Sequence, residues 1–441
     1  MDLLVTVLQF LLSLSILIVT HEGGHFFFAK LFGIRVEKFY LFFDPWFELF
    51  KYKKGETEYG IGWLPLGGYV KISGMVDESL DMEQMKQPVQ EWEFRAKPAW
   101  QRLLVMLGGV LVNFIEAPLI FWLMLYTWGE TYVPLSEAKY GFEYSKPLQD
   151  AGLRDGDMIV GVNGVMTDKY KDVVNAIIFE DPCVLNVLRD GERKDIELPH
   201  EFFREILKGY NNEALLSFRI PAVIDSVIPN GYAAKAGLAK GDSIISVGGV
   251  PTPTFSTFTH TLGNLKNHEV DVVVARNAGT IDTLKAKIGE DGKLGIYAAQ
   301  ATRWIKPKHV EYGFFAAFPA GVSKGWETLV YYVRQLPMVF TKEGATKIGG
   351  FGTIAGMFPS RWDWQAFWFN TAFLAVILAF MNVLPIPALD GGHVLFLLVE
   401  IVTGRKLSDR ALEIAQNIGM AILFALLIYA NGADIVRAFF K

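Results

Sequence analysis

The chain has 441 residues, of which 51% are hydrophobic, 14% aromatic and only 20% charged. This composition argues against an ordinary water-soluble globular protein, because so apolar a chain places part of its surface in lipid. The formal net charge of −5 gives no basic excess, so nucleic acid is not an expected partner. The single cysteine, Cys183, cannot form an internal disulfide.

Four apolar stretches are long enough to cross a membrane as helices. The first has no basic start and no small-residue cleavage site, so we expect a retained span rather than a signal peptide. We also expect a shorter apolar helix at 393–402, and amphipathic helices at 312–340 that lie at the membrane interface. The expected spans are 3–32, 103–128, 367–384 and 411–430.

Basic residues flanking the spans predict the orientation of the chain. They gather between the first two spans and before the fourth, as Lys30, Arg35, Lys38, Arg95, Lys97, Arg102, Arg405, Lys406 and Arg410. These loops are therefore expected to face the cytoplasm. The N-terminus, the long segment 129–366 and the C-terminus then share the opposite side.

The long segment contains a repeated motif. The pattern A-G-L-x-x-G-D-x-I begins at Ala151 and again, 85 residues later, at Ala236. This offset suits one small domain that occurs twice in tandem, and the pattern resembles protease-associated PDZ domains. We therefore expect β-rich PDZ-like domains at 129–215 and 216–308. The resemblance implies a groove for an extended peptide or a C-terminal carboxylate; packing or steric filtering is the alternative role.

The most informative pentapeptide lies in the first span, from His21 through Glu22 to His25. Residues four apart share one face of a helix, so both imidazoles reach one metal ion while Glu22 lies beside it as a general base. Zinc is the expected ion, with two neutral histidines, a carboxylate and an open position for water. Three ionisable side chains inside an apolar span are costly without partners, which favours a functional role over chance.

The third ligand is expected in 382–393, where two prolines and two glycines end the third span. Broken helix at membrane depth is tolerated where it is buried in protein or lines a watery cavity. Asp390 is the predicted ligand, with helix N-capping as its alternative role, and His393 is the competing ligand. Asn382 is predicted to hydrogen-bond an extended substrate backbone or, alternatively, backbone groups freed at the helix break.

In this order the motifs resemble the site-2 proteases, a family of intramembrane zinc metalloproteases. The family's H-E-x-x-H motif falls at 21–25 and its N-x-x-P-x-P-x-L-D-G motif at 382–391, with the PDZ-like domains between them. The resemblance implies that His21, His25 and Asp390 bind zinc and that Glu22 activates water. It also implies single-span membrane substrates: remnant signal peptides, or an anti-sigma factor already trimmed by a site-1 type protease.

The family resemblance extends to a membrane-entering β-hairpin. Residues 67–72 match it, and an edge strand there can pair with an unwound substrate; an ordinary cytoplasmic hairpin is the alternative. The predicted substrate-binding residues are Gly68, Tyr69, Val70, Lys71 and Ile72.

Two polar residues of the second span stand apart from these motifs. The family often has G-P-x-x-N where this chain has Gly109 to Asn113 without the proline, and Asn113 is expected to bond across helices. Glu116 matches no motif; it is expected to face a watery cavity near the zinc or to pair with a cation.

The predicted architecture is an α-helical membrane core of about four spans, formed by 1–128 and 367–441. It carries a membrane-associated β-hairpin, two PDZ-like domains and interfacial helices at 309–366. The predicted function is regulated intramembrane proteolysis that controls envelope stress transcription, at the bacterial inner membrane with the PDZ-like domains in the periplasm. The rivals are an inactive scaffold that gathers envelope proteins through its PDZ-like domains, and a metal carrier. The intact metal motifs argue against the first, and the lack of a second carboxylate cluster argues against the second.

Overall fold

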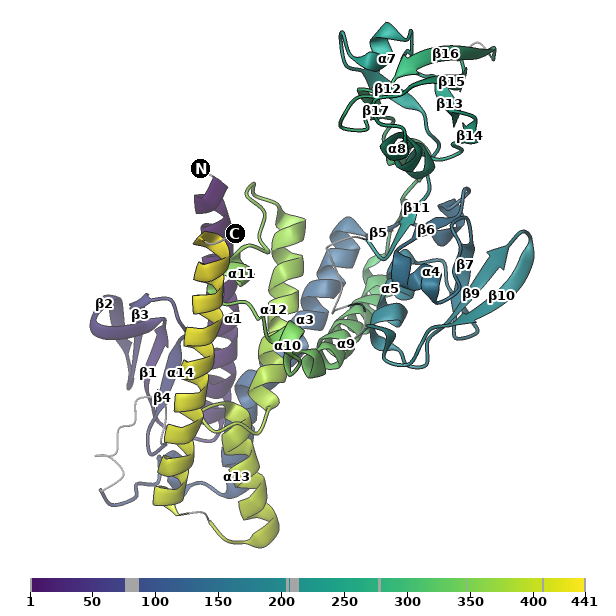
Figure 1. Ribbon diagram of the computed structural model, residues 1–441. Coiled ribbons are helices and arrows are strands. Elements are labelled where there is room, and N and C mark those ends of the chain that lie inside the picture. The colour runs from purple at the N-terminus through teal and green to yellow at the C-terminus, as the bar shows by residue number, and fades with distance from the viewer. Residues whose placement is uncertain are drawn as a thin grey trace. The chain divides into compact units, whose positions relative to one another are not determined.

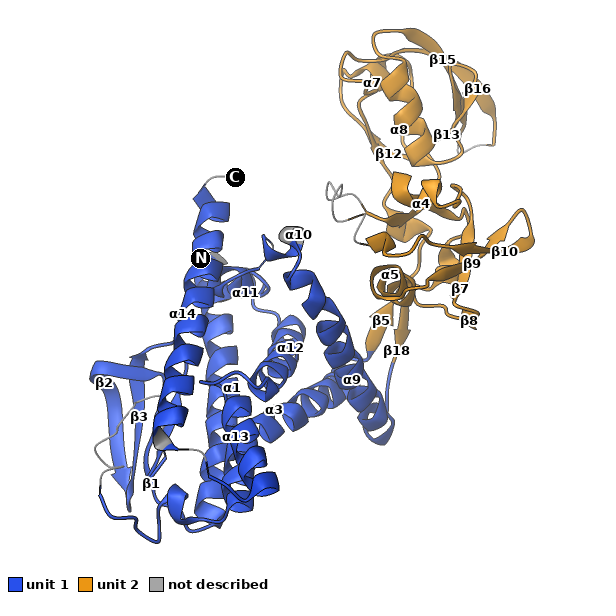
Figure 2. Ribbon diagram, turned by 60° about the horizontal axis from the view of Figure 1, so that its bottom comes forward, with its two compact units in different colours: residues 1–129, 311–441 blue, residues 130–310 orange. Residues whose placement is uncertain are grey.

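The computed structural model describes residues 2–75, 87–203, 206, 214–276, 279–346, 348–406 and 408–439. Two compact units divide the chain (Figure 2): residues 1–129 together with 311–441, and residues 130–310. The first unit thus contains every expected membrane span, and the second contains the repeated motif. Part of the first predicted repeat, 207–213, lies outside the described residues.

The first unit is built mainly from helices (Figure 1). Among the described residues, four helices are long and apolar enough to cross a membrane, the number predicted from the sequence. They are α1 (Asp2–Leu31), α3 (Ala99–Trp128), α12 (Trp364–Val383) and α14 (Asp409–Phe439). The shorter apolar helix expected at 393–402 belongs to α13 (Asp390–Thr403). The segment expected to be interfacial contains one long helix and two short ones: α9 (Phe314–Val339), α10 (Lys342–Ala345) and α11 (Phe351–Ala355).

A four-stranded sheet lies beside the helices of the first unit (Figure 1). Its order is β2-β3-β1-β4, with β1 parallel to β3 and antiparallel to β4. The strands are β1 (Val36–Leu41), β2 (Phe43–Lys54), β3 (Thr57–Leu64) and β4 (Tyr69–Ile72). Residues 69–72, expected in a hairpin, therefore form an edge strand of a larger mixed sheet.

The second unit has two separate hydrophobic cores, one formed by residues 135–216 and one by 222–294. Around the first core lie β5 (Glu130–Tyr132), β6 (Phe142–Tyr144), α4 (Lys146–Asp150), β7 (Met158–Val162), β8 (Val165–Met166), α5 (Tyr170–Phe179), β9 (Val184–Arg189), β10 (Glu192–Glu197) and β11 (Leu216–Phe218). The second core is enclosed by β12 (Ile224–Val227), α7 (Tyr232–Lys235), β13 (Ser243–Val247), β14 (Val250–Pro251), α8 (Phe255–Asn264), β15 (Glu269–Ala275), β16 (Ile281–Lys287) and β17 (Ile296–Ala298). Strand β18 (Lys308–Val310) returns to pair with β5.

The repeated motif forms the same buried turn in both halves of the second unit. In the first half, the carboxylate of Asp157 accepts the backbone N–H of Arg154 at 2.8 Å and two hydrogen bonds from Arg189, at 2.6 and 2.7 Å. Arg189 also donates to the carbonyl of Gly152 at 2.8 Å. Asp157 is only 2% exposed, so this ion pair closes the turn inside the domain.

The second half repeats these contacts with its own residues. Asp242 accepts the N–H of Ala239 at 2.9 Å and a hydrogen bond from Arg276 at 2.6 Å, and Arg276 donates to the carbonyl of Gly237 at 3.1 Å. Gly237 has φ +81°, a conformation that side chains rarely adopt. The motif is therefore explained by a turn that each half needs in order to fold.

We expect Asp157→Ala to destabilise the first half of this unit by about 3 kcal/mol, because it leaves a guanidinium unpaired at the edge of the core. The thiol of Cys183, in the core of the same half, reports on any opening of this domain. Burial, reinforced by Glu180 and Asp181, raises the pKa of its thiol to about 12, so the folded domain reacts poorly with thiol reagents at pH 8. The rate of Cys183 labelling should rise about 100-fold in the variant, in line with the population of the opened domain.

The matched control is Asp150→Ala, which breaks an exposed ion pair with Lys146. An exposed pair contributes little to stability, so labelling should stay close to the wild-type rate. Equal labelling rates in the Asp157 and Asp150 variants would contradict a structural role for the repeated turn.

Candidate metal centre and substrate cleft

Helices α1 and α3 approach so closely that only glycine fits between them. A Cβ atom at Gly24 would lie 2.2 Å from the carbonyl oxygen of Gly108. One at Gly109 would lie 2.5 Å from His25 Nε2 and 2.6 Å from His21 Cε1. Small residues permit such contact between helices in lipid. Both imidazoles therefore lie directly against the backbone of α3.

Asp390 lies at the end of a sharp chain reversal that follows α12. Ala388 has φ +77°, and α13 starts at Asp390 with Leu389 as its N-cap residue. A Cβ at Gly391 would lie 2.2 Å from the carbonyl oxygen of Leu384, so glycine is required there. The glycines and prolines of this segment thus fold the chain back on itself. Asp390 is the first helical residue and does not have the N-cap position considered as its alternative role.

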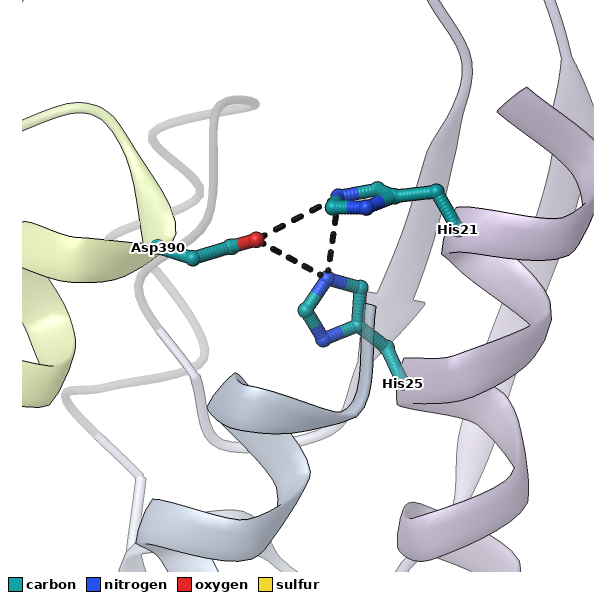
Figure 3. A group of neighbouring side chains, drawn as sticks. All are labelled: His21, His25 and Asp390. Carbon is teal, nitrogen blue, oxygen red and sulfur yellow. Dashed lines mark hydrogen bonds and ion pairs between the residues drawn. The ribbon is translucent and has the colours of Figure 1, made fainter. Parts of the chain in front are cut away.

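The side chains of His21, His25 and Asp390 converge on one point (Figure 3). Asp390 Oδ2 lies 3.3 Å from His21 Nε2 and 3.4 Å from His25 Nε2. The two Nε2 atoms are 3.3 Å apart. The three predicted ligand residues therefore come together although 365 positions (390 − 25) separate Asp390 from His25.

This donor set fits a zinc ion. Ligand atoms about 2.0–2.1 Å from a tetrahedral zinc ion are about 3.3–3.4 Å from one another, which the three distances match. Asp390 Oδ2 is buried and accepts no hydrogen bond from the described residues, so its lone pairs are open toward the centre of the group. His25 Nδ1 lies 2.8 Å from the carbonyl of Val105, which requires a proton on Nδ1 and leaves Nε2 free to bind a metal.

A cleft of about 360 Å³ opens beside these three residues. Among the predicted residues, Glu22, Asn382, Tyr69, Val70, Lys71 and Ile72 line it, together with His21, His25 and Asp390. Gly68 packs against α1 instead, because a Cβ there would lie 2.4 Å from Ile18 Cγ2. The competing ligand His393 also lines the cleft but is not part of the converging group.

The cleft also contains several residues that were not predicted from the sequence. Phe43 and Asp44 come from the first residues of β2, and Met106 and Gln416 come from α3 and α14. The Asp44 carboxylate accepts a hydrogen bond from Tyr69 at 2.9 Å, which ties β2 to β4 across the sheet. No sequence motif marks these side chains, since the sheet pairing alone brings Asp44 to the cleft.

Polar contacts hold the Asp390 segment in place. Arg102 on α3 is 7% exposed and pairs with Glu400 on α13 at 2.5 Å. Gln416 on α14 accepts the backbone N–H of Ala388 at 3.3 Å. These contacts fix α13 and the turn before it, and therefore the position of the Asp390 carboxylate.

Glu116 lies on α3 and forms a hydrogen bond with a residue of α1. Its carboxylate accepts the Thr20 hydroxyl at 2.8 Å, and it is not among the residues that line the cleft. A neutral hydroxyl on the neighbouring helix thus occupies the place of the cation considered from the sequence.

Comparison with known proteins assigns the chain to a family. A family model described as Peptidase family M50 matches residues 9–426. The chain belongs to this family, the site-2 proteases. The chain is 28% identical over 462 residues to the regulator of sigma-E protease RseP of Escherichia coli, covering 97% of this chain and 98% of that protein. It is 27% identical over 508 residues to a putative zinc metalloprotease of Thermotoga maritima, covering 98% and 99%. A putative zinc metalloprotease of Vibrio cholerae is 28% identical over 463 residues, covering 99% of both chains.

The family membership confirms three of the predictions made from the sequence. The protein is a zinc metalloprotease, it resembles the regulators of sigma-E, and with four apolar helices it is a membrane protein.

The contact between α1 and α3 gives a test within the H-E-G-G-H motif itself. We expect Gly24→Ala to push α1 away from the Gly108 carbonyl and displace both imidazoles. A misplacement of about 1 Å costs on the order of 100-fold in activity. Zinc content after purification, measured by atomic emission, should fall together with proteolytic activity.

The neighbouring Gly23→Ala variant is the control, because a Cβ there meets nothing within 4 Å. It should keep wild-type zinc content and activity. If both glycine variants behave alike, the close contact at Gly24 does not explain the glycines of the motif.

Proposed function

We propose that the protein is an intramembrane protease in which His21, His25 and Asp390 bind the zinc ion and Glu22 is the general base. One observation carries the proposal: three donor atoms from two distant segments are spaced as tetrahedral zinc ligands. Glu22 lines the same cleft. The donor type, the spacing and the neighbouring carboxylate together suit metal-assisted peptide hydrolysis.

The chemistry divides between the ion and the chain. Bound zinc supplies a Lewis acid that polarises the scissile carbonyl and lowers the pKa of water to about 7. Glu22 takes a proton from the attacking water as the new carbon–oxygen bond forms. It then gives that proton to the leaving amide nitrogen as the carbon–nitrogen bond breaks. Asp390 and the two histidines remain deprotonated at the atoms that face the ion.

Substrate binding is proposed to use β4 and Asn382. A helical substrate hides its carbonyls in hydrogen bonds, so it has to unwind first, and glycine or proline in the target lowers the cost. Strand β4 is an edge of its sheet, and its residues line the cleft, so an unwound segment can add to it by main-chain bonding. Asn382 Nδ2 lies 3.5 Å from His21 Nε2, close enough to orient a substrate carbonyl beside the ion.

The biological setting is proposed from the relatives' names and from the charge pattern. We infer a multi-pass protein of the bacterial inner membrane, with residues 130–310 as two PDZ-like domains in the periplasm. The substrates are single-span membrane proteins, an anti-sigma factor trimmed by a site-1 type protease or remnant signal peptides. Envelope stress transcription is the process regulated. The alternative is an inactive scaffold that binds envelope proteins, which the spacing of the three donors does not favour.

Two variants distinguish the role of the general base from that of the metal ligands. We expect Glu22→Gln to keep its zinc and to lose cleavage of a single-span substrate, because the amide cannot accept the proton from water. We expect His21→Ala to lose zinc as well. Zinc content and cleavage are measured on the same purified samples. Equal cleavage by wild type and Glu22→Gln would refute the enzyme mechanism.

The role of β4 is tested by photo-crosslinking in the Glu22→Gln background. A photoreactive phenylalanine at Tyr69 should form an adduct with a single-span substrate. The same group at Tyr52, on the opposite edge strand β2 and 58% exposed, should not. An adduct at Tyr52 alone would place the substrate elsewhere on the sheet.

A further inference from the structure

Asn113 is a buried amide that the mechanism above does not use. It lies on α3, is 0% exposed, and its Nδ2 atom is 3.2 Å from His21 Nδ1. Its Oδ1 atom is also buried and has no hydrogen-bond partner among the described residues. A fully buried amide with one orphaned atom carries a cost that the structure has to offset.

The chemistry of His21 indicates how the Asn113 amide is oriented. His21 Nε2 faces Asp390 and His25. It can bind a metal there only through its lone pair, so the proton of the neutral ring is on Nδ1. A protonated Nδ1 requires an acceptor, whereas an amide NH₂ group is a donor. Oxygen and nitrogen of an amide have nearly the same shape, so rotating the Asn113 amide by half a turn is sterically neutral. Rotation places Oδ1 against the Nδ1 proton, where it accepts that hydrogen bond, and puts Nδ2 at the buried position that Oδ1 had.

We propose that Asn113 is a positioning residue: its Oδ1 accepts the Nδ1 proton of His21 and holds the imidazole in the tautomer that presents Nε2 to zinc. This proposal rests on the proposed zinc site. His25 has the equivalent contact from the same helix, the carbonyl of Val105 at 2.8 Å. Metal-binding histidines generally have such a partner on the second nitrogen, which fixes the ring and raises its basicity.

The neighbouring polar side chains do not replace this contact. Thr20, next to His21, donates its hydroxyl to Glu116 at 2.8 Å, one turn further along α3. Asn382 approaches His21 on Nε2 rather than Nδ1. Asn113 is therefore the side chain that the structure places at Nδ1, and Glu116 provides a control on the same helix.

The experiment compares Asn113→Leu, Asn113→Asp and Glu116→Gln in the full-length protein. Zinc affinity is measured by competition with a chromophoric chelator, and unfolding of the metal-free protein is followed separately. We expect Asn113→Leu to bind zinc 10–100-fold more weakly, the usual effect of losing such a partner. Asn113→Asp keeps an acceptor for the Nδ1 proton and should restore wild-type affinity. Glu116→Gln should leave zinc affinity unchanged.

Two outcomes would overturn the proposal. One is wild-type zinc affinity in Asn113→Leu; the other is an Asn113→Asp variant that folds and yet binds zinc as weakly as the leucine variant. If Asn113→Leu does not fold, Asn113→Ala takes its place with the same expected loss. Failure here is distinguishable from failure of the zinc site: His21→Ala then still loses zinc, whereas a wrong zinc site leaves zinc bound in His21→Ala.

Discussion

The close contact between α1 and α3 is the constraint on which the metal centre depends. Lipid gives helices little hydrophobic reason to associate, so association relies on close packing, and glycines make that packing possible. Gly24 meets Gly108, and Gly109 lies under both imidazoles. The H-E-x-x-H pattern alone places two histidines on one face of a helix. Helix α3 contacts both rings, through the Val105 carbonyl 2.8 Å from His25 Nδ1 and the Asn113 amide 3.2 Å from His21 Nδ1.

The same helix also locates the third donor. Arg102, one turn before Val105 on α3, pairs with Glu400 at the far end of α13, whose first residue is Asp390. Removing two charges from water costs free energy, and their attraction offsets that cost only when the geometry of the pair is good. Helix α3 therefore positions a histidine through a carbonyl and a carboxylate through an ion pair. Neither contact involves an atom that takes part in the reaction.

How much of this was predictable depends on how local each signal is. The spacing of His21 and His25, and the prolines and glycines before Asp390, are local, and the sequence predicts that these residues matter. The second span was expected to start at 103, with Arg102 among the basic residues that flank it. In the structure α3 begins at Ala99 and includes Arg102, which pairs with Glu400, 298 positions away. The parallel pairing of β1 with β3 is likewise non-local, and a backbone carbonyl such as that of Val105 leaves no sequence pattern.

The repeated motif is a strong sequence signal, but its contacts, repeated within each half, form a turn of the fold rather than a binding site. Asp157 and Asp242 are both 2% exposed, and each accepts from a backbone N–H and an arginine, so neither is open to a ligand. Any difference in peptide binding between the two halves has to come from residues outside the motif. One such residue is Tyr170 on α5, whose hydroxyl donates to the carbonyl of Leu216 on β11 at 2.7 Å. That carbonyl thus already accepts one hydrogen bond within the domain. The two halves can therefore share a turn, and with it a fold, while differing in whether an extended segment can be bound.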